Sequence, residues 1–319
     1  MSDFPIDGTL MPGARRIVSV CAGVQPGEQV VIISDTNRPR SVITALLEAV
    51  TEAGGIGSAI ITKPVPSGAE PPDAVRAAIH ASDVTLAVTS GALYHTRAVQ
   101  DAGDLRFLGL TAFIPEVLRE GGVFADFPAL APRAYRLAEL LSRARTARVT
   151  APGGTDLTVD LTGRDAVPIT ALAHERGEKN GCPDIEAFIA PIESSANGVV
   201  LVDASASVAG VLSEPIRITV ENGRAVSIEG GAGADAVRAA LEAAGFDSVY
   251  QLAEFAFGLN PNGIIRGVIV EDEGVAGTGH IALGSNIHFG GANDAPLHLD
   301  FVYREPTLWL DGEQVEIVG

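Results

Sequence analysis

Short apolar runs alternate with helix-like segments over the first part of the chain. Strand-length apolar runs occupy residues 29–34, 57–62, 83–90 and 105–110. Apolar side chains at helical spacing predict helices over residues 40–53, 72–81, 114–119 and 137–147. Strands separated by helices favour βαβ units and a parallel sheet. We therefore predict a Rossmann-like α/β domain over residues 1–145, although its first strand is not followed by a dinucleotide fingerprint.

From about residue 146 the pattern changes to short runs in which apolar and polar residues alternate. Gly153-Gly154 and Asn222-Gly223 lie between such runs, and both pairs are hairpin signals. A helix is predicted at 235–244, closed by Gly245. Residues 146–319 should form a β-rich domain. The predicted fold class is α/β, with a Rossmann-like N-terminal domain that contains a parallel sheet and a β-rich C-terminal domain that binds metal.

Charge and cysteine content narrow the class of protein. The 319 residues include 22 Lys and Arg and 40 Asp and Glu, which gives a formal net charge of −18. This acidity argues against nucleic-acid partners and against an anionic membrane surface. The chain carries no apolar run of membrane-spanning length and no signal-peptide pattern at its N-terminus. Its two cysteines, Cys21 and Cys182, suit a reducing compartment, so we expect a cytoplasmic protein.

Histidine and aspartate near the C-terminus are candidate metal ligands. His298 and Asp300 are two positions apart in the strand-like run LHLDFVY, so their side chains should share one face. His280 lies in the glycine-rich segment GVAGTGHIALG. Together the three residues could form a set of two histidines and one carboxylate.

Two glutamates stand in apolar surroundings, where a carboxylate needs a partner or a metal. Glu186 lies in CPDIEAFIAP, and Glu254 lies in QLAEFAFGLNP. Either could also lie on the polar stripe of an amphipathic segment. The acidic run 271–273 is typical of a solvated loop.

These segments resemble, in order, the conserved blocks of the metallo-aminopeptidase family that includes aminopeptidases T and S. The similar stretches, over about residues 150–310, are GGTDLTVDLTGR, NGCPDIEAFIAP, AEFAFGLNP, EDEGVAGTGHIALG and PLHLDFV. The resemblance implies two divalent metal ions (zinc, manganese, cobalt or iron) and a metal-activated water that hydrolyses an amide bond. It also implies a homodimer.

Carried over residue by residue, the ligands of that family fall on Glu186, Glu254, His280, His298 and Asp300, with Glu186 at the position that bridges the two ions. Glu273 corresponds to a glutamate that could act as the base or steer the water.

Three departures from the family bear on the substrate. Ile287 stands where the family has a catalytic tyrosine, and the adjacent His288 could replace it as a catalytic residue. Gly274 stands where the family has a lysine, and the chain is shorter. We therefore expect a hydrolase that acts on a short peptide or on a small amide, including a cyclic one.

The chain also resembles the 2,5-dihydroxypyridine 5,6-dioxygenases, which share this fold and hold one Fe(II) with two histidines and one aspartate. PLHLDF matches them closely, but Glu254 replaces their first histidine, and they lack the equivalents of Glu186 and His280. Ring cleavage of a hydroxylated pyridine is therefore the alternative prediction. A binder of small molecules without catalysis is a second alternative, and other metal-dependent chemistry is a third.

Overall fold

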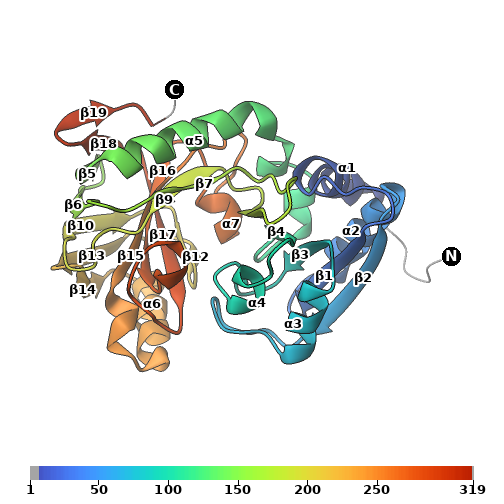
Figure 1. The fold of residues 1–319 in the computed structure, drawn as a ribbon. Helices are drawn as coiled ribbons and strands as arrows, with labels where there is room; N and C mark the ends of the chain where they lie inside the picture. The colour runs from blue at the N-terminus through green and yellow to red at the C-terminus, as the bar shows by residue number, and fades with distance from the viewer. Residues whose placement is uncertain (1–6, 318–319) are drawn as a thin grey trace. The chain divides into compact units, whose positions relative to one another are not determined.

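The computed structural model of the chain describes residues 7–317, and the fold consists of two compact units (Figure 1). The first unit combines Met1–Pro128 with Thr170–Pro183, and the second combines Ala129–Ile169 with Asp184–Gly319. The sequence predicted a single boundary, between residues 145 and 146, and that boundary stays a prediction.

The first unit is built on a parallel sheet of five strands. The strand order is β2-β1-β3-β4-β8, and every neighbouring pair runs parallel. The strands are β1 (Gln29–Asp35), β2 (Ile56–Thr62), β3 (Val84–Val88), β4 (Arg106–Gly109) and β8 (Lys179–Gly181). The first four confirm predicted strands. The fifth comes from the segment that the sequence assigned to the β-rich half, and three residues are too short a run to show a period.

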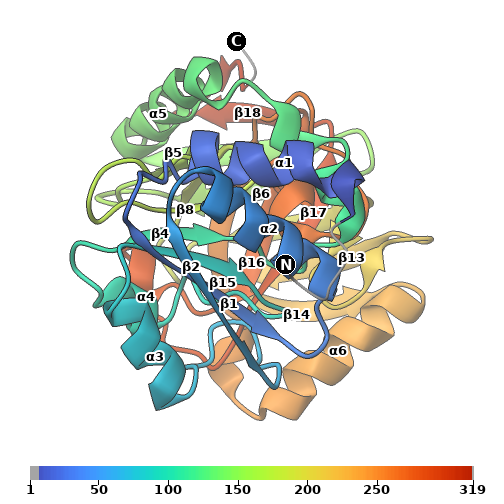
Figure 2. The same cartoon turned by 90° about the vertical axis from the view of Figure 1, so that its right-hand side faces the viewer.

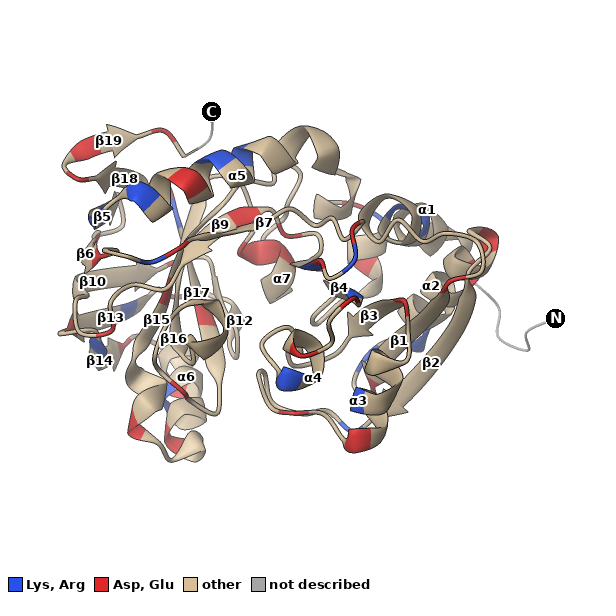
Figure 3. Cartoon of the chain, in the orientation of Figure 1, with Lys and Arg blue, Asp and Glu red and all other residues tan. Residues whose placement is uncertain are grey.

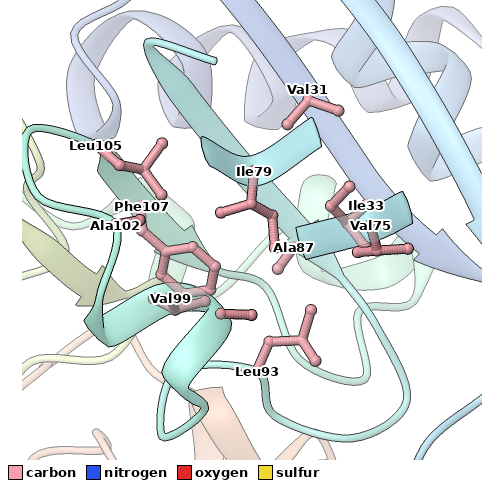
Figure 4. Close-up of a cluster of buried hydrophobic side chains, with 11 residues drawn as sticks. Val31, Ile33, Val75, Ile79, Ala87, Leu93, Val99, Ala102, Leu105 and Phe107 are labelled. Carbon is pink, nitrogen blue, oxygen red and sulfur yellow. The ribbon is translucent and has the colours of Figure 1, made fainter. Parts of the chain in front are cut away.

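Helices cover both faces of this parallel sheet. Figure 2 shows α1 (Met11–Arg15) and α2 (Arg40–Glu52) in front of it. On the other face, α3 (Asp73–His80) and α4 (Arg97–Gln100) enclose a core of buried aliphatic side chains around Phe107 (Figure 4). Alternate residues of β1 explain the two layers, since Val31 and Ile33 point into this core while Val30 and Ile32 lie on the opposite face.

The second unit contains two antiparallel sheets of seven strands each. One has the order β14-β13-β10-β6-β5-β18-β19, and the other has the order β12-β11-β17-β16-β15-β9-β7. The first sheet consists of β5 (Thr146–Ala151), β6 (Thr155–Asp160), β10 (Asn197–Val202), β13 (Ile216–Glu221), β14 (Arg224–Glu229), β18 (Thr307–Leu310) and β19 (Glu313–Val315). The second consists of β7 (Val167–Ile169), β9 (Glu186–Ile189), β11 (Ser205–Ala206), β12 (Gly210–Val211), β15 (Leu252–Gly258), β16 (Thr278–Gly284) and β17 (His298–Arg304). The predicted fold class is thereby confirmed.

Turn chemistry fixed the hairpins in this unit, but one helix differs from its prediction. The Gly153-Gly154 turn joins β5 to β6, and Asn222 and Gly223, at φ 50° and 80°, join β13 to β14. The predicted helix at 235–244 is α6 (Ala232–Ala244). By contrast α5 spans Phe127–Arg143, so the predicted helix at 137–147 begins too late and ends too late. The helix continues through Pro132, and Thr146 already pairs with β6.

The remaining helices are short. They are α7 (Ile269–Asp272) and the turns η1 (Gly8–Leu10), η2 (Arg16–Cys21), η3 (Pro115–Leu118), η4 (Gly122–Phe124), η5 (Asp247–Tyr250) and η6 (Ile287–Phe289). The predicted helix at 114–119 is therefore the 3₁₀ turn η3.

Acidic side chains occur on helices, strands and loops throughout, as expected at a net charge of −18 (Figure 3). Among the described residues, no helix is both long enough and apolar enough to span a membrane.

Candidate metal centre

Four neighbouring strands of the second antiparallel sheet carry the predicted metal ligands. Glu186 begins β9, Glu254 lies in β15, His280 in β16, and both His298 and Asp300 lie in β17. The register places Glu254 and Asp300 on either side of Ala282. Because side chains alternate between faces, the ligand residues share one face, and small residues between them leave space for an ion.

Glu254 lies between two imidazoles. Its Oε1 atom is 3.1 Å from His280 Nε2, and its Oε2 atom is 3.4 Å from His298 Nε2. Burial alone raises the pKa of Glu254, but the hydrogen bonds with His280 and His298 outweigh burial and hold that pKa well below its usual range. Glu254 is therefore an ionised carboxylate with one oxygen on each side.

Further carboxylates complete a ligand group on each side of Glu254. Glu186 Oε2 lies 3.5 Å from His280 Nε2, and Asp300 Oδ1 lies 3.0 Å from His298 Nε2. Glu186, Glu254 and His280 thus offer three donor atoms within 4.8 Å of one another, and so do Glu254, His298 and Asp300. The residue shared by both groups is Glu254, whereas the resemblance gave the bridging position to Glu186.

Backbone and hydroxyl groups hold His298 and Asp300 in place. The Nδ1–H of His298 donates to the carbonyl oxygen of Ser285 at 2.8 Å, so Nε2 faces the carboxylates. Ser207 Oγ donates to Asp300 Oδ2 at 3.1 Å and accepts the backbone N–H of Asp300 at 2.8 Å. Oδ1 of Asp300 is thereby directed toward His298. The sequence analysis missed Ser207, because it lies 93 residues away and reaches Asp300 only through the pairing of β11 with β17.

Asp184 is a further buried acid of this cluster that the sequence analysis missed. Burial, followed by the charge of Glu273, raises the pKa of Asp184 well above its usual range. Burial, followed by the charge of Asp184, does the same for Glu186. The i, i+2 spacing of Asp184 and Glu186 equals that of His298 and Asp300, and it was the signal available in the sequence.

The acidic run 271–273 is buried, so the prediction of a solvated loop was wrong. Glu271 pairs with Arg266 at 3.0 Å, and Asp272 accepts the backbone N–H groups of Arg266 and Gly267. These contacts fix α7 and place Glu273 within 4.8 Å of ligand atoms of His280 and Asp300.

Gly274 follows Glu273 at a position without room for a side chain. A Cβ atom there would lie 2.3 Å from Asp184 Oδ1 and 2.9 Å from Asp184 Cα. The lysine of the aminopeptidase pattern is therefore incompatible with Asp184 in its present position.

The structure does not bring His288 to the ligand cluster. Its side chain is exposed on η6, as is that of Ile287, and the described contacts of the cluster do not include it. The next residue, Phe289, instead packs edge-to-face against His298, with ring centroids 5.8 Å apart.

The donor set fits a divalent cation. Glu186 Oε2 is buried and accepts no hydrogen bond among the described residues. Five carboxylates (Asp184, Glu186, Glu254, Glu273 and Asp300) are buried with only two imidazoles to offset their charge. Burying so much negative charge is costly unless positive charge accompanies it. Carboxylate and imidazole donors suit manganese, iron, cobalt and zinc.

The fold and the site together define an α/β metalloenzyme with its metal centre on an antiparallel sheet. A sequence model of the NicX family, described as 2,5-dihydroxypyridine 5,6-dioxygenase, matches residues 10–319. The chain belongs to this family.

Individual relatives are more distant. A 2,5-dihydroxypyridine 5,6-dioxygenase of Pseudomonas putida is 27% identical over 192 residues, which cover 56% of this chain and 55% of that protein's length. The solved structure of 2,5-dihydroxypyridine dioxygenase from Pseudomonas putida KT2440 has a TM-score of 0.79 at 20% identity, covering 98% of this chain and 96% of that one. AmpT from Thermus thermophilus has a TM-score of 0.69 at 18% identity, covering 97% and 99%. The fold is thus shared by both groups of enzymes.

Family membership corrects the functional prediction. The main prediction of a metallohydrolase of the aminopeptidase type, acting on an amide, was wrong, because the family match over residues 10–319 is to dioxygenases. The prediction that the chain is an enzyme holds, and an enzyme of this family depends on metal. The number and identity of the ions are separate questions.

The contacts of Ser207 yield a test of the ligand geometry. We expect Ser207→Ala to weaken divalent-metal binding about 10- to 100-fold, because Asp300 loses the group that orients it. Competition with a chromophoric chelator measures the affinity. Ser227→Ala is the matched control, since this hydroxyl lies on β14 and donates to Glu229. Equal affinities of the two variants would show that Ser207 does not orient a ligand.

The buried acids yield a prediction for the metal-free protein. The pKa values of Asp184, Glu186 and Glu273 are raised on folding, so the folded state holds protons that the unfolded state releases. Stability should therefore fall as the pH rises from about 5 to 8. The raised pKa of His298 acts in the same direction.

Thermal melting of chelator-treated protein at the two pH values checks this prediction. Added divalent metal should reduce the difference in Tm, and Glu186→Gln should reduce it without metal. A Tm of the chelated protein that rises over this pH range would contradict it.

Proposed function

We propose that this protein is a metal-dependent dioxygenase that opens the ring of 2,5-dihydroxypyridine or of a closely similar hydroxylated pyridine. The observation that carries the proposal is the family match over residues 10–319, which includes the buried group of Glu254, His298 and Asp300. This was the alternative prediction from the sequence.

Glu254, His298 and Asp300 are the residues proposed to hold the catalytic ion, with Fe(II) as the expected metal. One imidazole and two carboxylates replace the two imidazoles and one carboxylate common in non-haem iron oxygenases. The bound ion supplies the redox chemistry that O₂ requires to react with a closed-shell ring. The hydrogen bond from His298 Nδ1 to Ser285 and the contacts of Ser207 with Asp300 keep both side chains oriented.

The proposed reaction adds one molecule of O₂ across a carbon–carbon bond. The bond between C5 and C6 of the ring breaks, and each carbon gains one oxygen atom. C5, which bears a hydroxyl group, becomes a carboxyl group, and C6 becomes a formyl group on the ring nitrogen. The ring is oxidised and O₂ is reduced, so no further reductant is needed.

Glu273 is the residue proposed to accept the proton of a ring hydroxyl group. It lies within 4.8 Å of ligand atoms of His280 and Asp300, and burial raises its pKa well above the usual range. A carboxylate with a raised pKa is a stronger base than an ordinary one. The catalytic role of His288, the homodimer and the cytoplasmic location stay predictions.

A second ion is proposed for the group formed by Glu186, Glu254 and His280, in agreement with the two ions that the sequence predicted. The separate donor set around His280 supports it, because Glu254 offers a different oxygen to each histidine. Glu186→Ala should lower the metal content from about two ions per chain to about one. Elemental analysis of protein purified without chelator measures the ratio. A wild-type content of one ion would contradict the second site.

Oxygen uptake tests the proposed function. Protein loaded anaerobically with Fe(II) should consume O₂ when 2,5-dihydroxypyridine is added. His298→Ala should reduce the rate more than about a hundredfold, because loss of a ligand exceeds the loss of a ligand's outer partner. His80→Ala, at an exposed histidine of the first unit, is the control and should retain the activity. No uptake by the metal-loaded wild-type protein would refute the proposal.

A further inference from the structure

An aromatic pair lies next to the candidate ligand His298. The ring of Phe289 packs edge-to-face on His298, with centroids 5.8 Å apart and an interplanar angle of 82°. Phe188, on β9, packs edge-to-face on Phe289 with centroids 5.1 Å apart. Both phenylalanines are buried, while Ile287 and His288 beside Phe289 are exposed. The turn thus lies at the protein surface and directs one aromatic ring to the metal centre.

Hydrogen bonds close the loop that carries Phe289 into a defined shape. Asn286 is fully buried, and its backbone and side chain exchange hydrogen bonds with Asn293 at 3.1 and 2.8 Å. At Gly291 a Cβ atom would lie 1.9 Å from Asn286 Cγ, so only glycine fits there. Phe289 is therefore held in position by the loop as well as by its own packing.

A buried ion pair anchors the same loop from outside the metal centre. Glu193 accepts the backbone N–H of Ala292 at 2.6 Å and the side-chain amide of Asn286 at 3.3 Å. Arg164 pairs with the other oxygen of Glu193 at 2.6 Å. The position of Phe289 is thus fixed by charged groups that do not belong to the ligand cluster.

The aromatic pair differs in chemistry from the rest of the site. The ligand residues are acids and imidazoles, and Ala256 and Ala282 lie between them in the sheet. Such surfaces bind oxygen atoms and cations, but they offer little to the face of a neutral ring. Phe289 and Phe188 present the apolar, polarisable edges and faces that attract an aromatic ring.

We propose that Phe289, supported by Phe188, positions the ring of a planar, hydroxylated nitrogen heterocycle beside His298. This inference rests on the proposed function, since it concerns the substrate of the same site. Phe289 is a substrate-positioning residue, and the contact restricts the site to flat aromatic substrates.

Kinetics and anaerobic binding of 2,5-dihydroxypyridine to Fe(II)-loaded protein test the proposal together. Phe289→Ala and Phe289→Leu should raise both KM and the anaerobic Kd about tenfold, because the aromatic contact is lost. Phe289→Tyr retains the ring and should restore both values. Metal content and kcat should change less than about twofold in all three variants, since the ligands remain. Phe246→Ala, at a phenylalanine that is 61% exposed in the same unit, is the matched control.

The outcomes separate this inference from the proposed function. Wild-type O₂ uptake with unchanged KM and Kd in Phe289→Ala would overturn the role of Phe289 alone. Loss of metal from Phe289→Leu would also overturn it, because Phe289 would then act by supporting His298. Absence of O₂ uptake, with anaerobic ring binding that depends on Phe289, would overturn the dioxygenase and support the aromatic contact. No anaerobic binding by the wild-type protein would overturn the inference.

Discussion

The structure depends most on the burial of mutually repelling carboxylates around two imidazoles. Asp184, Glu186, Glu254, Glu273 and Asp300 share one part of the sheet face, and burial or neighbouring charge raises the pKa of three of them. A protein gains nothing in stability from such a cluster without a cation. The free energy of metal binding therefore offsets the cost of assembling it, and metal affinity and fold stability should be linked.

The surrounding elements keep these charges in a fixed geometry. Strand register sets the spacing of Glu254 and Asp300, while Ser207 and the Ser285 carbonyl orient Asp300 and His298. The loop that carries Phe289 is anchored separately, through Glu193. The same face thus combines a rigid set of oxygen and nitrogen donors with an aromatic contact, and a metal-binding hydroxylated ring requires both.

Much of the fold could be predicted because its signals are local. Buried strand runs, the Asn222-Gly223 turn and the helix closed by Gly245 depend on neighbouring residues, and the structure confirms them. Ser207, Asp184 and Phe289 were missed because their roles arise from strand pairing and loop closure. The burial of Glu271 depends on Arg266, which local charge patterning does not reveal. The reaction class was wrong because the ligand types at Glu186, Glu254 and His280 were weighed above similarity along the whole chain. Both enzyme groups share this fold, so ligand types in one half did not decide between their reactions.

The most direct test of the account is the fate of isotopically labelled oxygen. Fe(II)-loaded protein would convert 2,5-dihydroxypyridine under ¹⁸O₂, and rapid mass spectrometry would count the labelled atoms in the product before they exchange with water. The account predicts a ring-opened product that contains both oxygen atoms of one O₂ molecule. A product whose added oxygen comes from water, or a ring that stays closed, would contradict it.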